Sequence, residues 1–290
     1  MRVLVTGAGG LLGGRIAALL AQRGFDVLAV YRRAAPPPGL ESTSIELTDP
    51  GAVEALLDRQ APAALIHSAA LARADLCQGQ PELAEEVNAR LPGRLGALCR
   101  ARGIRLVGLS TDLVLNGDRS FSDESRAAPL SLYGRTKLAG EVALLAADPS
   151  AAVARVALVV GRGHGPRATA SEAIARALRA GQVLRLFTDE LRTPVDPESV
   201  TAALALLLER GGSGRFHLGG AERVSRHDLG LRAARLLSLP ADGIEAAVQS
   251  DHSGPEPRPA DTSLDSTRAH RELGWTPRPL DEALAESRTA

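Results

Sequence analysis

The chain has 290 residues, of which 44% are hydrophobic and only 2% aromatic, and its formal net charge is zero. This length suits one large or two moderate domains, and a balanced charge gives no indication of a nucleic-acid or membrane partner. No stretch has transmembrane length without charge or glycine, and the two cysteines lack metal or disulfide spacing. We therefore expect reduced thiols in a cytoplasmic protein.

The N-terminal residues follow the order strand, glycine-rich turn, helix, strand. Arg2–Thr6 is a short β-branched run, a helical pattern follows the glycines as far as Gln22, and Phe25–Tyr31 is a second apolar run. This is the βαβ context that a dinucleotide-binding fingerprint requires. It predicts an α/β protein with a Rossmann-type, doubly wound parallel sheet.

Three glycines occupy the turn with the spacing G-x-x-G-x-x-G. Gly7 permits a tight turn, Gly10 lets the backbone approach a pyrophosphate, and Gly13 allows the helix to pack closely on the strand. The free N–H groups and the dipole of the helix N-terminus favour a negative charge there. A lone glycine motif is weak evidence, but in this context it predicts a nucleotide site.

The second strand ends at Tyr31, Arg32 and Arg33, with no acidic side chain. A site that prefers NAD usually carries an acid here for the ribose 2′-hydroxyl, whereas arginine grips a 2′-phosphate in its planar fork. We therefore expect NADP(H) to be preferred over NAD(H). The alternative is that one of these arginines only caps the end of the strand and has no role in cofactor preference.

The next two units carry smaller signals. Ser44–Leu47 is predicted as a strand, and Asp49 as the cap of the helix that follows, although Asp49 could equally meet the edge of an adenine ring. The fourth strand runs into Ala69 and Ala70, whose small side chains leave room for a cofactor. His67, within that strand, is interpreted as a structural residue.

A long helix is predicted over residues 81–102, with a kink at Pro92. Asn88 is polar among apolar neighbours, so we expect it to be buried and hydrogen-bonded. The strand Ile104–Leu109 ends in Ser110-Thr111-Asp112. Polar side chains at the carboxyl end of a strand lie where open α/β sheets bind ligands.

The sequence Tyr133-x-x-x-Lys137 carries the clearest chemical signal. On a helix these two residues share a face, and an ammonium group beside a phenol lowers the tyrosine pKa. Lys137 is the only lysine of the chain, and there are only two tyrosines. Lysine differs from arginine in being a compact charge whose proton can move. Taken alone, the alternative of a surface lysine on an ordinary amphipathic helix stays open.

The pattern changes after a sixth strand over Ala151–Val160, because the second half has no glycine fingerprint and several polar loops. We expect an NADP-binding domain over residues 1–160, completed by about 194–212. A substrate-binding part would consist of residues 161–193 and 213–290. Within these segments the predicted helices cover 171–180, 198–210, 225–237 and a section near Leu280, the strands cover 182–187 and 215–218, and 252–259 is irregular.

These motifs together resemble the extended short-chain dehydrogenase/reductase family. The resemblance is carried by Thr6-Gly7-x-x-Gly10-x-x-Gly13, Ser110-Thr111-Asp112, Tyr133-x-x-x-Lys137 and Arg155. Within the family the chain is most similar to the dTDP-4-dehydrorhamnose reductase group, through Tyr133–Glu141, Asp189–Pro194 and Arg258-Pro259. The resemblance covers nearly the whole chain and implies a smaller C-terminal α/β substrate domain.

The resemblance also implies roles for individual residues. Thr111, Tyr133 and Lys137 would form the catalytic set, with Lys137 also holding the nicotinamide ribose, and Asp112 and Arg192 would face a nucleotide-sugar substrate. The cofactor would be lined by Gly7, Gly10, Leu11, Leu12, Arg32, Ala69 and Ala70. Leu113, Leu115 and Leu158 replace aromatic residues of the family pattern, which leaves the sugar open. Some members form a magnesium-bridged dimer, so a homodimer is one expectation, with no residue assigned to a metal.

Three functions remain in view from the sequence. The first is NADPH-dependent reduction of a 4-keto sugar nucleotide. The second is an epimerase or dehydratase that recycles its nucleotide, for which Asp112 provides an acidic residue. The third is a cofactor-holding regulatory subunit similar to the β-subunit of methionine adenosyltransferase, although a pure binding module does not need the Thr-Tyr-Lys set.

Overall fold

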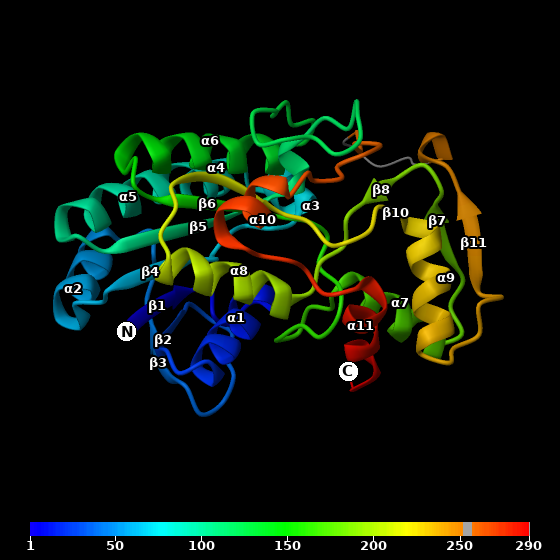
Figure 1. Ribbon diagram of the computed structural model, residues 1–290, viewed down its shortest axis with the longest axis horizontal. Helices are drawn as coiled ribbons and strands as arrows, with labels where there is room; N and C mark the ends of the chain where they lie inside the picture. Colours follow the sequence, from blue (N-terminus) through cyan, green and yellow to red (C-terminus); the bar gives the residue numbers. More distant parts are fainter. Residues whose placement is uncertain (252–256, 290) are drawn as a thin grey trace.

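The computed structural model describes residues 1–251 and 257–289. Seven strands form one parallel sheet in the order β3-β2-β1-β4-β5-β6-β9 (Figure 1). This order confirms the predicted Rossmann-type α/β fold. The strands are β1 (Arg2–Thr6), β2 (Asp26–Tyr31), β3 (Glu41–Ser44), β4 (Ala64–His67), β5 (Arg105–Thr111), β6 (Ala152–Val156) and β9 (Gly214–Leu218).

Helices cover both faces of this sheet (Figure 1). One face packs against α1 (Leu11–Gln22) and α8 (Pro197–Glu209), and the other against α2 (Pro50–Gln60), α5 (Leu91–Arg102) and α6 (Leu132–Ala147). Both interfaces consist mainly of Leu, Val, Ile and Ala, as the aromatic-poor composition predicts. Within the described residues, no helix is long and apolar enough to cross a membrane.

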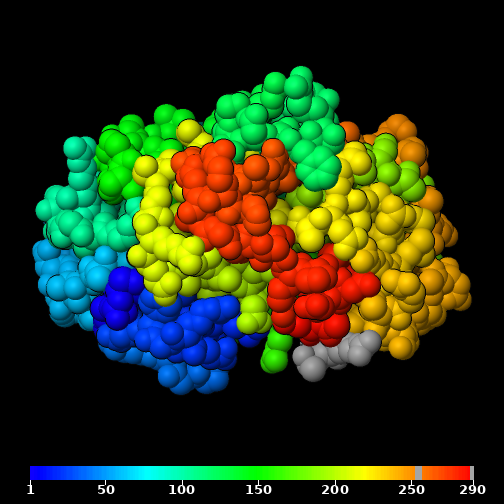
Figure 2. Space-filling view, viewed as in Figure 1, coloured from blue at the N-terminus to red at the C-terminus, as the bar shows by residue number. Residues whose placement is uncertain are grey.

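The C-terminal residues add a smaller α/β part beside the carboxyl ends of the strands. It contains two small sheets, in which β7 pairs with β11 and β8 pairs with β10. The last helices lie across the boundary between the two parts and cover it on the face seen in Figure 2. The elements are α7 (Ala170–Arg179), β7 (Leu184–Phe187), β8 (Leu191–Arg192), β10 (Val224–Ser225), α9 (Arg226–Leu236), β11 (Ile244–Ala247), α10 (Thr267–Leu273) and α11 (Leu280–Ala285).

Three local predictions differ from the structure. The strand predicted at 44–47 is wrong, because β3 ends at Ser44 and the apolar Ile45 and Leu47 instead pack on the core beyond it. The single helix predicted over 81–102 is interrupted by a π-helical turn over Glu86–Arg90, just before Pro92, whose missing N–H removes a helical hydrogen bond. Also, α3 (Ala74–Gly79) was not predicted.

The predicted division into two parts stays a prediction, and one observation bears on its boundary. β9 pairs with β6 in the main sheet, so the seventh strand comes from residues after the predicted return segment 194–212. In the predicted irregular segment 252–259, residues 252–256 lie outside the described residues.

Candidate active site

The glycine turn between β1 and α1 has the close contacts that exclude side chains. Gly7 has a φ of +70°, and a Cβ built on it would lie 2.7 Å from the Ala69 nitrogen. A Cβ on Gly13 would lie 2.3 Å from the Gly7 oxygen. Gly10 caps α1, whose first turn has no acidic residue, and Leu11 and Leu12 are half-buried. The turn therefore fits the pyrophosphate of a dinucleotide, because backbone and free N–H groups are all that it presents.

The remaining predicted cofactor residues lie at the carboxyl ends of β2 and β4 or just after β3. Arg32 and Arg33 are exposed, and an Arg32 nitrogen lies 3.6 Å from a Glu46 oxygen. This acid beside Arg32 was not anticipated. Asp49 is the N-cap of α2, because its Oδ1 accepts hydrogen bonds from the Gly51 and Ala52 nitrogens at 3.0 and 3.3 Å. Tyr31, Ala69 and Ala70 are half-buried.

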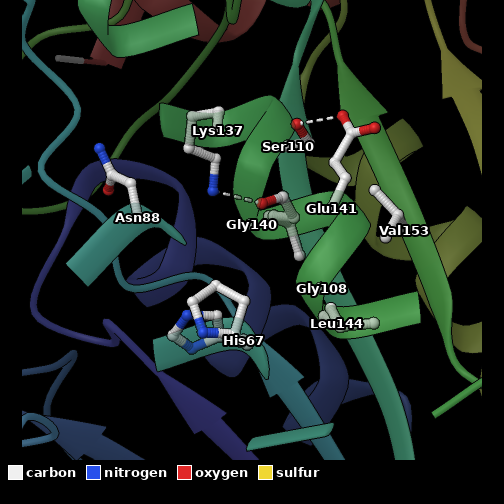
Figure 3. Close-up of a pocket in the computed structure, with 11 residues that line it drawn as sticks. His67, Asn88, Gly108, Ser110, Lys137, Gly140, Glu141, Leu144 and Val153 are labelled. Atoms are coloured by element: carbon white, nitrogen blue, oxygen red, sulfur yellow. Dashed lines mark hydrogen bonds between the residues drawn. The ribbon is translucent and has the colours of Figure 1, made fainter. Parts of the chain in front are cut away.

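The structure brings the three predicted catalytic residues together. Ser131 caps α6 by accepting the Gly134 N–H at 3.0 Å, so Tyr133 lies in the first turn and Lys137 one turn later. Lys137 is buried, and its Nζ donates to the Leu109 oxygen of β5 at 2.8 Å (Figure 3). Thr111 ends β5, its hydroxyl donates to Asp112 Oδ1 at 3.1 Å, and it lies close enough to Tyr133 to lower the tyrosine pKa. All three side chains therefore meet at the carboxyl end of β5.

The electrostatics of this set differ from the prediction. Burial and the neighbouring Asp112 carboxylate raise the pKa of Tyr133, and only the hydrogen bond with Thr111 acts in the opposite direction. The expectation that Lys137 lowers the tyrosine pKa is therefore wrong for this structure, in which the ammonium points to a backbone carbonyl. Burial lowers the pKa of Lys137 to about 8, although the Glu141 carboxylate acts against this shift.

Asp112 and Arg192, the predicted substrate residues, face each other across the two parts of the chain. An Arg192 Nη1 lies 3.4 Å from Asp112 Oδ2, and the Thr262 hydroxyl donates to the same oxygen at 2.9 Å. Arg192 Nη2 also donates to Glu190 Oε1 at 3.0 Å. Both predicted residues are nearly fully buried, so they pair with each other rather than stand open to solvent.

Sequence reasoning missed several residues around this pair. The Glu190 carboxylate lies within 4.0 Å of nitrogens of Arg192, Arg226 and Arg258. It accepts a hydrogen bond from Arg258 at 2.7 Å. Arg226 lies at the start of α9, and its buried Nη1 has no hydrogen-bond partner among the described residues. Burial lowers the pKa of Arg226, and the positive charges of Arg192 and Arg258 add to this shift. The sequence analysis predicted only a helix over residues 225–237 in this region.

A second buried ion-pair network joins Glu141 of α6 to residues of the main sheet. The Glu141 carboxylate accepts from Arg155 Nε at 2.9 Å and Nη2 at 2.8 Å, from Ser110 at 2.6 Å and from Arg215 at 2.8 Å. Arg155 Nη1 also donates to the carbonyls of Glu124 and Arg126, in the loop that leads to α6. Burial alone would raise the pKa of Glu141, but Arg155 outweighs it and the pKa is lowered.

Comparison with known proteins identifies a family and relatives for the whole chain. The sequence profile of the RmlD substrate binding domain family matches residues 1–289. The probable low-salt glycan biosynthesis reductase Agl14 of Haloferax volcanii is 33% identical, covering 98% of this chain and 96% of its own. A dTDP-4-dehydrorhamnose reductase of Mycolicibacterium smegmatis is 32% identical, covering 99% and 84% respectively.

One solved structure aligns with this chain over nearly its whole length. It is that of a hypothetical dTDP-4-dehydrorhamnose reductase from Sulfolobus tokodaii, with a TM-score of 0.84 and 27% identity. The alignment covers 97% of this chain and 98% of that one. Within residues 1–251 and 257–289, no group of three or more His, Cys, Asp or Glu side chains could hold a metal ion.

Proposed function

The chain belongs to the RmlD substrate-binding domain family, and from that premise we propose that it is an NADPH-dependent reductase of a 4-keto sugar nucleotide. The observation that carries this proposal is the meeting of Thr111, Tyr133 and Lys137 at the carboxyl edge of the sheet. The glycine turn opens at the same edge. A binding module would need the turn but not the three side chains.

In the proposed reaction the side chains handle the proton. When bound, the nicotinamide cofactor supplies the hydride that reduces the ketone carbon. Tyr133 donates its phenolic proton to the forming alkoxide, and its raised pKa keeps that proton in place before the reaction. Thr111 hydrogen-bonds the same oxygen, and the role we give Lys137 is to hold the nicotinamide ribose.

The preference for NADPH is part of the proposal. Arg32 and Arg33 follow β2 without an acid at its end, which suits a 2′-phosphate. Glu46 lies near Arg32, but both side chains are about half exposed, so solvent screens this pair and a phosphate can compete for the arginine. Oxidation of NADPH that is faster than that of NADH, at equal concentrations, would support the assignment.

The exact substrate is the least constrained point. The relatives include dTDP-4-dehydrorhamnose reductases and a probable glycan-biosynthesis reductase, so a dTDP-linked 4-keto-6-deoxysugar is the first substrate to test. An epimerase or dehydratase of the same fold would show no net consumption of added NADPH. A regulatory subunit would bind NADPH without turnover. A homodimer and a cytoplasmic location stay predictions from the sequence.

The decisive variant is Tyr133→Phe, which removes only the proton donor. We expect kcat to fall by about 10²- to 10⁴-fold while NADPH binding is retained, because general acid catalysis contributes about this much. Substrate-dependent loss of NADPH absorbance measures turnover, and fluorescence titration measures binding. Normal turnover in this variant would contradict the role given to Tyr133.

A further inference from the structure

His67, at the end of β4, has a ring nitrogen that nothing in the described structure satisfies. The side chain is 2% exposed, and its Nδ1 lies 2.9 Å from the Thr6 hydroxyl. The other nitrogen, Nε2, has no hydrogen-bond partner among the described residues. Buried polar atoms are nearly always partnered by protein or by ordered water, so this atom indicates a missing partner.

His67 lines a small internal cavity together with Lys137 (Figure 3). The walls come from β5 at Gly108–Ser110, from α6 at Lys137–Leu144, and from Asn88 and Pro92. The space is about large enough for one water molecule. The lining is mixed, because five polar or charged side chains stand among apolar residues, and a cavity of this size that offers such hydrogen-bond partners is a site for one ordered water.

The other polar side chains of the lining are already engaged. The Asn88 amide accepts from the Leu71 nitrogen and donates to the Leu71 oxygen and the Thr136 hydroxyl. The Ser110 hydroxyl donates to Glu141, whose carboxylate oxygens are filled by the two arginines described above.

Lys137 differs from these residues, because within the described part of the chain only one of the three N–H groups on Nζ has a partner, the Leu109 oxygen. Two groups with unmet hydrogen bonds therefore share the cavity, His67 Nε2 and Lys137 Nζ.

We propose that a single ordered water occupies this cavity and joins Lys137 Nζ to His67 Nε2, which makes His67 a positioning residue for Lys137. The water accepts from the ammonium, and it donates to or accepts from Nε2 according to the tautomer that Thr6 selects. The consequence for catalysis rests on the proposed function, but the water and the state of Lys137 do not.

The charges around Lys137 explain why the water matters. Burial and the charge of Lys137 lower the pKa of His67 to about 3, so the ring is neutral and adds no competing charge. Glu141 is neutralised by Arg155 and Arg215, and Tyr133 is held protonated. The ionisable side chains whose charge acts on Tyr133 are Asp112 and Cys77. The proposed water therefore provides most of the solvation of the buried Lys137 ammonium, and burial lowers the pKa of this group.

The experiment uses the fact that Lys137 is the only lysine of the chain. Full-length protein grown with ¹³Cε,¹⁵Nζ-lysine gives one side-chain signal, and its chemical shift against pH gives the titration midpoint directly. We expect His67→Phe to lower that midpoint by about one pH unit, because an ammonium without its water is less well solvated. His67→Gln, which offers a side-chain amide where Nε2 was, should return the titration midpoint most of the way to the wild-type value.

Thr6→Val is the matched control, because it breaks the bond to Nδ1 and leaves Nε2 in the cavity. Its midpoint should stay at the wild-type value. An equal midpoint in wild type and His67→Phe overturns the proposal. If His67→Phe does not fold, a high-resolution crystal structure of the wild type decides instead, since a water between the two nitrogens supports the proposal and a dry cavity refutes it. A lack of reductase activity in every protein would count against the proposed function alone.

Discussion

Two buried charge clusters flank the candidate active site, and they differ in how completely their hydrogen bonds are filled. The Glu141 cluster consists of Glu141, Arg155, Ser110 and Arg215, and it lies behind the catalytic helix. The Glu190 cluster consists of Glu190, Asp112, Thr262, Arg192, Arg226 and Arg258, and it lies between the two parts of the chain. Both contain carboxylates that are almost fully buried.

The Glu141 cluster is closed. Each oxygen of the Glu141 carboxylate receives two donors, and Nη1 of Arg155 donates to two loop carbonyls. The Glu190 cluster is open, because Arg226 keeps an unpartnered Nη1 within the described structure and Arg258 is partly exposed. A closed cluster serves as a frame for the helix and loop that it joins, whereas an open cationic cluster is suited to an anionic ligand.

The sharpest test of this difference is Glu141→Gln. Removing one partner of a buried ion pair leaves Arg155 uncompensated, so we expect the free energy of unfolding to fall by about 3–5 kcal/mol. Thermal unfolding followed by circular dichroism should show a decrease in Tm of about 10 °C. Glu245→Gln makes the same chemical change on the exposed strand β11 and should leave Tm unchanged. A similar Tm in both variants would mean that the Glu141 cluster is not a frame.

The pH dependence of the same pair follows from the lowered pKa of Glu141. Because the pKa of Glu141 in the folded state lies below its ordinary value of 4.5, the ion pair contributes full stability above that pH. The contribution is lost as the pH falls through the lower folded-state value. The difference in stability between wild type and Glu141→Gln should therefore shrink as the pH falls below about 4.5. A difference that stays constant down to pH 3 would contradict this assignment.

For the open cluster, Arg226→Gln should affect binding and not folding. Loss of a hydrogen bond to a charged ligand costs about 1.5–3 kcal/mol, so we expect the KM for the sugar nucleotide to rise by about 10- to 100-fold. Tm and NADPH affinity should change little. Arg235→Gln, on the exposed side of the same helix, is the matched control. A large fall in Tm with an unchanged KM would make this cluster a second frame and remove the contrast.

The sequence predicted the features that lie within one element or one turn. Gly7 has the positive φ of a tight turn, Gly13 contacts Gly7 within the same turn, and Tyr133 and Lys137 share one helix, so spacing alone was sufficient. Repeated apolar runs predicted the parallel sheet, but the strand at 215–218 was assigned to the substrate-binding part, whereas β9 is the seventh strand of that sheet. β3 was misplaced because the apolar Ile45 and Leu47, which pack beyond this edge strand, resemble a strand themselves.

The charge clusters could not be predicted, because their partners are far apart in the chain. Asp112 and Arg192 were each assigned by resemblance, but their pairing depends on how the C-terminal part docks. β8 and β10 have two residues each, which is too short for any periodicity to indicate them. The unsatisfied nitrogens of His67 and Arg226 are likewise visible only when every neighbour has been placed.

The smallest expected effect tests whether the closed cluster is redundant. Arg215 Nε donates to Glu141 Oε2 at 2.8 Å, but its side chain is 29% exposed, so solvent screens the interaction. In Arg215→Ala the carboxylate keeps both bonds to Arg155 and the bond from Ser110, so no buried charge is left bare. We expect a loss of at most about 1 kcal/mol, seen as a decrease in Tm of about 2–4 °C that is reduced further by added salt. A loss as large as that of Glu141→Gln would mean that Arg155 alone cannot neutralise Glu141. The frame would then depend on an arginine at the protein surface, and the distinction between the closed and open clusters would fail.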